Sequence, residues 1–72
     1  MDKPEELLIA KHIHQDDELR RSVEDHRNFE KALEQFNKRL YLTPEEEMEK
    51  KKLQKMKLMS KDKIYQILNK YR

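Results

Sequence analysis

The chain has 72 residues, of which 44% are charged and 35% hydrophobic, and its formal net charge is +2. A chain this short buries only about 60% of the surface that its unfolded form exposes, so one domain with one small core is the upper limit. It has no cysteine, which excludes a disulfide framework and a thiolate zinc site and leaves helix packing or association with another chain as the source of stability.

The first predicted element is a short helix over residues 5–13, opened by Pro4, which suits the first turn of a helix. Its apolar side chains include Leu7, Leu8 and Ile13. A helix of this length is not stable alone. We therefore expect it to dock on the open end of the rest of the chain or on a neighbouring chain.

The apolar run in this first helix, LLIA, is the longest in the sequence. It is far shorter than the roughly 20 residues that span a bilayer, and no basic segment of a signal peptide precedes it. We therefore expect a soluble protein without a membrane partner. The lack of cysteine fits a reducing compartment, so we expect a cytoplasmic location.

A long helix is predicted over residues 17–41. Asp16 can cap its N-terminus, and Lys38 and Arg39 lie near its negative pole. Apolar side chains with His26 recur at steps of three and four, which is one face of an α-helix. This stripe contains Leu19, Val23, His26, Phe29, Leu33, Phe36 and Leu40.

The tetrapeptide TPEE predicts the start of a second long helix, over residues 44–70. Thr43 suits the N-cap, Pro44 suits the first helical position, and Glu46 completes a capping box with Thr43. Proline disfavours the helical conformation of the residue before it, so the preceding helix should end near residues 40–42. A connection of two or three residues then makes the two helices antiparallel neighbours.

The fold class predicted from these elements is all-α, an antiparallel coiled-coil hairpin with a short N-terminal helix. The register pairs Leu33 with Leu53, Phe29 with Met56, Val23 with Ile64 and Leu19 with Ile67, and it places His26 opposite Ser60. The predicted core seam consists of Leu19, Val23, His26, Phe29, Leu33, Phe36, Leu53, Met56, Ile64 and Ile67.

The three histidines are the only side chains that titrate near neutral pH. His26 lies on the apolar stripe, where a packed histidine bonded to Ser60 or to water is expected. His12 and His14 are two residues apart, about 200° around a helix, so they cannot share one metal ion. Without glycine there is no phosphate-binding loop. We expect no metal, no cofactor and no catalysis.

Seven lysines and one acid, Asp62, lie between Lys50 and Lys63. The lysines surround the helix, and Glu46 and Glu47 stand four residues before the first two of them, which favours a solvated, ion-paired surface. Nucleic acid is an unlikely partner, because no arginine cluster or aromatic platform accompanies the lysines; binding to it would be weak and salt-sensitive. Weak binding to nucleic acid through this helix is the alternative function.

Leu58 and Tyr65 are seven residues apart on the back of the second long helix, which is typical of a second contact seam. Either another chain or the N-terminal segment could cover it. Because a bare hairpin buries little, we expect a homodimer. The candidate association surface is Leu7, Leu8, Ile13, Leu58 and Tyr65. The predicted function is a non-enzymatic protein-interaction or self-association module.

The segments EDHRNFEKAL and LQKMKLMSKDKI resemble the YdcH-like family, small bacterial proteins classed as a domain of unknown function. The family's first-helix pattern of an acid-His pair, a Leu-Asp pair and an Ile corresponds here to Asp25, His26, Phe29, Glu30 and Leu33. Its lysine-rich second run is matched at Leu53, Lys55, Lys57, Leu58, Lys61, Asp62 and Ile64. The chain departs from the pattern at Glu18, Gln54, Ser60 and Lys63.

This resemblance covers about residues 5–70. It implies a helical hairpin, a bacterial source and no assigned chemistry. Glu18 stands where the family has a further histidine, so the resemblance implies no histidine pair. Ser60 stands where the family has a core leucine, which makes the layer containing His26 more polar here.

Overall fold

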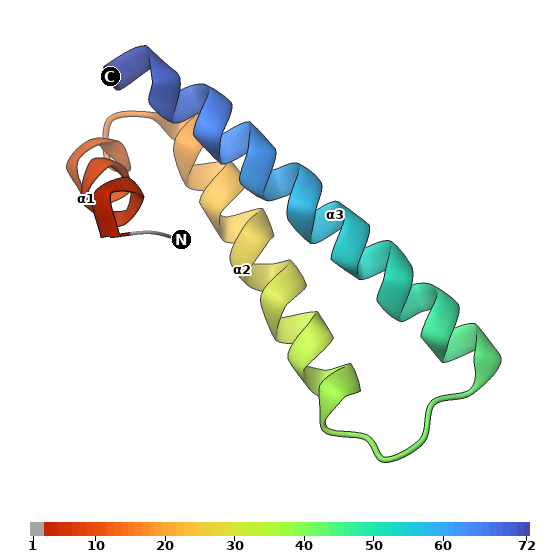
Figure 1. Ribbon diagram of the computed structural model, residues 1–72. Helices are drawn as coiled ribbons and strands as arrows, with labels where there is room; N and C mark the ends of the chain where they lie inside the picture. The colour runs from red at the N-terminus through yellow and green to blue at the C-terminus, as the bar shows by residue number, and fades with distance from the viewer. Residues whose placement is uncertain (1–2) are drawn as a thin grey trace.

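The computed structural model describes residues 3–72. This part of the chain forms three α-helices, α1 (Lys3–His12), α2 (Asp17–Asn37) and α3 (Pro44–Leu68), followed by a single 3₁₀ turn, η1 (Asn69–Tyr71). α2 and α3 run antiparallel along the length of the molecule, and α1 lies beside their open end (Figure 1). The predicted all-α hairpin with a short N-terminal helix is confirmed.

The starts of both long helices are fixed by the caps predicted from the sequence. The Asp16 side chain accepts a hydrogen bond from the Leu19 amide at 3.0 Å. The Thr43 hydroxyl accepts one from the Glu46 amide, and the Glu46 carboxylate accepts one from the Thr43 amide, both at 3.1 Å. With Pro44 in the first turn, this completes the capping box. These bonds satisfy amide groups that a helix start leaves without a partner.

The end of α2 differs from the prediction. The helix stops at Asn37 instead of residue 41, and residues 38–43 form the connection to α3. In this connection Leu40 is 94% exposed and Tyr41 89% exposed. The Arg39 amide donates to the Phe36 carbonyl at 3.2 Å, a tight final turn that closes the helix early.

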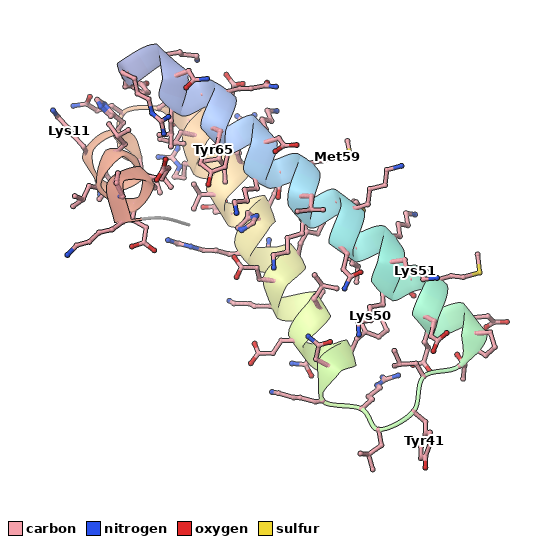
Figure 2. The ribbon with its side chains drawn as sticks, viewed as in Figure 1. Lys11, Tyr41, Lys50, Lys51, Met59 and Tyr65 are labelled. Atoms are coloured by element: carbon pink, nitrogen blue, oxygen red, sulfur yellow. The ribbon has the colours of Figure 1, made fainter. Side chains whose placement is uncertain are left out.

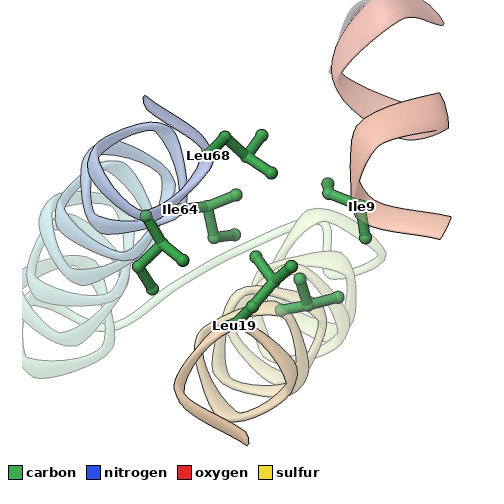
Figure 3. Packing of buried hydrophobic residues seen from close by; sticks show 6 residues of the cluster. Ile9, Leu19, Ile64 and Leu68 are labelled. Atoms are coloured by element: carbon green, nitrogen blue, oxygen red, sulfur yellow. The ribbon is translucent and has the colours of Figure 1, made fainter. Parts of the chain in front are cut away.

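The core lies at the open end of the hairpin, where all three helices meet. Leu19, Ile64 and Leu68 are fully buried, and Ile9 of α1 reaches toward them (Figure 3). Val23 and Ile67 complete this open-end cluster. Leu8, Ile13 and Tyr65 are half-buried against it. The N-terminal helix therefore docks on its own chain.

The half of the hairpin nearer the connection is packed more loosely. Leu33 is buried there, whereas Phe29, Phe36 and Leu53 are only half-buried. The assignment of Met56 to the core seam is wrong, because its side chain is 37% exposed. Met56 lies about 80° around α3 from Ile64 at 100° per residue, and no third helix covers that flank within residues 3–72. The hairpin is thus well packed at one end only.

The position of the core leads to a stability prediction. Ile64→Ala should lower the free energy of unfolding by about 2–5 kcal/mol, because it removes buried methyl groups and leaves a cavity. Urea denaturation followed by helical circular dichroism measures this loss. Met48→Ala is the control, since Met48 is an exposed residue of α3 and its truncation should change the free energy by no more than about 0.5 kcal/mol. Equal losses would contradict the assignment of the open-end cluster as the core.

Candidate functional site

A polar layer crosses the contact between α2 and α3. The buried His26 Nδ1 lies 3.1 Å from the Ser60 hydroxyl oxygen and 3.3 Å from the Lys57 carbonyl oxygen. The Ser60 hydroxyl itself donates to the Lys57 carbonyl at 2.7 Å. On its other side His26 Nε2 lies 3.0 Å from the Glu30 carboxylate. The predicted pairing of His26 with Ser60 is confirmed.

The direction of these bonds constrains the imidazole. Because the Ser60 proton is directed to the Lys57 carbonyl, the Ser60 oxygen is left to accept, and His26 Nδ1 acts as the donor. Nε2 then faces a carboxylate oxygen of Glu30, a contact that is attractive when Nε2 also carries a proton. The layer therefore ties the two helices together through the contact of His26 Nδ1 with the Ser60 hydroxyl and the Lys57 carbonyl, while Glu30 lies on the same helix as His26.

A second polar cluster joins the C-terminal turn to the N-terminal part of the chain. The Tyr71 hydroxyl donates to the Asp16 carboxylate at 2.5 Å, and the Tyr71 ring stacks on His12 with centroids 3.7 Å apart. Arg72 donates to the Glu5 carboxylate at 3.0 Å. These contacts link α1, the start of α2 and η1 into one structural unit, which we call the open-end clasp.

The clasp shifts the titration of both of its hydrogen-bonded groups. The bond from Tyr71, followed by the bond from the Leu19 amide, lowers the pKa of Asp16 below its ordinary value of 3.8. The same bond raises the pKa of the Tyr71 hydroxyl above its ordinary value of 10.0, because a deprotonated Tyr71 could no longer donate to the carboxylate. The contact therefore favours a charged Asp16 and a neutral Tyr71.

Two shallow grooves run along the face of the hairpin that carries α1. One lies between α2 and α3 and includes Leu33 and Leu58 in its lining. The other lies between α1 and α2 and includes Ile13 and His26. Arg27 and Glu30 of α2 belong to both linings, so the two grooves follow one another along this face. Both are open to solvent, which makes them surfaces for contact with another molecule and not enclosed reaction sites.

The lysine run lies on α3 as its spacing predicts. Lys50, Lys57 and Lys61 are half-buried along the flank of the apolar stripe, and the other lysines of the run are exposed. The expected ion pair between Glu46 and Lys50 is absent, because Glu46 pairs with Arg39 of the connection instead. Among residues 3–72, no lysine between positions 50 and 63 forms an ion pair.

The residues predicted to form an association surface separate into two groups. Leu8, Ile13 and Tyr65 are half-buried within the chain around the open-end cluster, and the Lys61 ammonium lies 5.8 Å from the centre of the Tyr65 ring. Leu7 and Leu58 remain exposed. Of the predicted pair on the back of α3, Leu58 is thus exposed and Tyr65 half-buried.

The described residues contain no group of three or more side chains placed to hold a metal ion. His12 stacks on Tyr71, while His14 lines the groove between α1 and α2. None of the helices in residues 3–72 has the length and apolar character needed to cross a bilayer.

Comparison with family models, with curated proteins and with solved structures finds no match to this chain. The resemblance to the YdcH-like family therefore stays a prediction from the two quoted segments.

Two of the polar contacts lie outside the sequence prediction. Glu30 stands four residues after His26, the spacing at which helical side chains meet, so the local pattern does indicate this contact. The bond between Tyr71 and Asp16 joins residues 55 positions apart in the sequence, and no local pattern predicts it. This bond can be predicted only when the register of α2 and α3 is known.

The clasp yields a prediction about titration. Tyr71→Phe should raise the pKa of Asp16 toward 3.8, because it removes the bond that lowers it most. Since a lowered pKa stabilises the fold above pH 3.8, the stability difference between wild type and variant should shrink as the pH falls below that value. Carbon NMR of the Asp16 carboxyl group measures the first effect and thermal unfolding at several pH values the second.

Tyr41→Phe is the matched control, since Tyr41 lies exposed in the connection between α2 and α3. It should leave the Asp16 titration unchanged. An identical Asp16 pKa in wild type and Tyr71→Phe would contradict the clasp.

Proposed function

We propose that this protein is a non-enzymatic helical hairpin that acts by association with another protein chain, first of all a second copy of itself. The observation that carries the proposal is the set of large apolar side chains left exposed on the hairpin. This set contains Leu7, Leu40, Tyr41, Met48, Met56, Leu58 and Met59. Contiguous exposed apolar patches are typical of interaction surfaces, and within this set Met56 and Met59 lie one turn apart on α3.

The loose packing near the connection supports the same proposal. Phe29 and Phe36 are aromatic residues that stay half-buried in the hairpin. A second chain could bury what remains of their surface, which the two helices alone do not. Two-helix hairpins commonly gain stability in this way, as pairs that form four-helix assemblies.

The polar groups of the molecule support association over catalysis. His26, the only buried histidine in residues 3–72, is engaged by Ser60 and Glu30 on both ring nitrogens. The grooves beside it are open, and enzymes usually exclude water from the reacting groups. Action in a bacterial cytoplasm is part of the proposal and rests on the sequence patterns alone.

Self-association makes a direct prediction for the mass in solution. Sedimentation equilibrium over a concentration series up to about 100 μM should give a mass that rises toward twice that of the 9.0 kDa chain. Burial of the half-exposed aromatic and methionine side chains is the physical reason. A mass that stays at the monomer value throughout the series would contradict self-association.

Nucleic-acid binding is a second candidate, favoured by one observation. The lysines at positions 50–63 project from α3 without ion pairs within the part of the chain that the structure describes. Free lysines attract phosphates without regard to sequence. We rank this candidate second because the lysines surround α3 and do not form one flat basic face.

A mobility-shift titration with duplex DNA and single-stranded RNA separates the two candidates. Nucleic-acid binding predicts a complex at low salt that weakens about 10³-fold or more between 50 and 200 mM salt when many phosphates are contacted. The triple variant Lys51→Glu, Lys52→Glu, Lys55→Glu should abolish such a complex. An unshifted probe at low salt would eliminate this candidate and leave self-association untouched.

A further inference from the structure

The two broad faces of the hairpin are not equivalent. On one face α1 packs over the open-end cluster, and the grooves that share Arg27 and Glu30 continue along it. Tyr65 points to the side of α3 that faces α1, while Met59 lies on the other side (Figure 2). Within residues 3–72 no helix covers the second face.

Helix geometry identifies the residues of this second face. Met56 is nine residues from Tyr65, which is two and a half turns, so the two side chains project to opposite sides of α3. Phe29 and Phe36 lie about 40° and 60° around α2 from the buried Leu33, on the side away from the groove-lining Arg27 and Glu34. The face opposite α1 therefore carries five apolar residues that we call the bare face: Phe29, Ala32, Phe36, Met56 and Met59.

None of these five side chains is fully buried by its own chain. Phe29, Ala32 and Phe36 are half-buried, Met56 is 37% exposed and Met59 61% exposed. The molecule extends 43 Å along its long axis and 18 and 17 Å across it. A stable interface buries about 800 Å² per partner, so a second copy would have to make contact along most of that length.

Charges on the same flank continue the stripe toward the open end. On α2, Asp25 lies one turn before Phe29 and Glu18 two turns before Asp25. Lys63 of α3 and Lys70 of η1 follow Met56 at steps of seven. Lys70 and Glu18 already face each other within one chain at 3.8 Å. Asp25 and Lys63 are exposed and form no ion pair within the described residues.

This charge pattern selects one symmetric arrangement of two hairpins. A two-fold axis parallel to the long axis of the molecule places α2 of one copy on α3 of the other. The acids Glu18 and Asp25 of one copy then face the side of the other copy that carries Lys63 and Lys70. A two-fold axis across the long axis places α2 on α2 and α3 on α3 in reversed direction, so Asp25 of one copy does not come opposite Lys63 of the other. Because homodimer contacts are generally two-fold, the first arrangement is the favoured one.

We propose that a second copy of this chain docks on the bare face, with its α2 on α3 of the first copy and both connections at the same end. The inference rests on the proposed self-association and adds its surface and orientation. His26 lies at the level of Ser60, so Asp25 comes within about one turn of the partner copy's Lys63. Phe29 likewise meets the partner copy's Met56.

Two neighbouring residues of α3 provide a matched test of the surface. Leu58 and Met59 are both 61% exposed, but Leu58 lines a groove on the α1 face and Met59 belongs to the bare face. Met59→Glu should raise the dissociation constant of the dimer at least about tenfold, because the two symmetric copies each place a charge in an apolar contact. Leu58→Glu should leave the constant unchanged. Circular dichroism should show both variants folded.

A charge exchange tests the orientation. Asp25→Lys alone and Lys63→Asp alone should each weaken the dimer about threefold to tenfold, because each opposes like charges at two symmetric places. The double variant should restore wild-type affinity. Sedimentation equilibrium measures all four proteins.

The outcomes separate this inference from the proposed function. Dissociation by Leu58→Glu and not by Met59→Glu would overturn docking on the bare face while self-association stands. Failure of the double variant to recover affinity would overturn the orientation. A wild-type protein that remains monomeric would overturn the proposed self-association and this inference together.

Discussion

The removal of Leu19, Ile64 and Leu68 from water is the constraint on which the rest of this structure depends. A chain with 35% hydrophobic residues has few side chains that can form a core. Most of its buried apolar residues lie where the three helices meet and not along the whole contact between α2 and α3. Burial of a full aliphatic side chain contributes about 1.5–3 kcal/mol. The position of α1, the closure of the C-terminal turn and the loose far end of the hairpin all follow from that concentration.

The polar layer marks the boundary between the two halves of the hairpin. On one side of His26 lie the fully buried aliphatic residues, and on the other side only Leu33 is buried. The contact of His26 with α3 restricts sliding of α2 along α3, because a shift by one turn would separate His26 Nδ1 from the Ser60 hydroxyl and the Lys57 carbonyl and leave this buried nitrogen without a partner. We regard the layer as a determinant of register and not as a source of much stability.

Most of the fold could be predicted from the sequence because its signals are local. The capping box at Thr43 and Glu46 fixes the start of α3, and the stripe spacing fixes which residues face the partner helix. The end of α2 was missed because Leu40, Tyr41 and Leu42 continue the apolar pattern, and periodicity does not show whether anything is present to bury them. Met56 was assigned to the core for the same reason. The spacing shows on which side of α3 a residue lies, but it does not show how much of that side the partner helix covers.

The candidate site was harder to predict than the fold. The pairing of His26 with Ser60 followed from the antiparallel register, since both lie on the contact faces of their helices. The division of the association residues did not follow, because it depends on where α1 docks. That position is set by contacts between residues far apart in sequence, such as the pair of Arg72 and Glu5. Sequence patterns predicted that the N-terminal helix docks at the open end of the hairpin or on a neighbouring chain, and they did not decide between the two.

The distance of the core from the connection has a consequence for how this chain folds. A hairpin with its strongest contacts beside the turn can close progressively from that turn, at little cost in chain entropy. Here the segment next to the turn is the weakest, and the contacts that stabilise the molecule close a loop that contains most of both long helices. We therefore expect folding to require an encounter of the two long helices at their far ends. Its rate should respond to changes at the open end more than to changes at the turn.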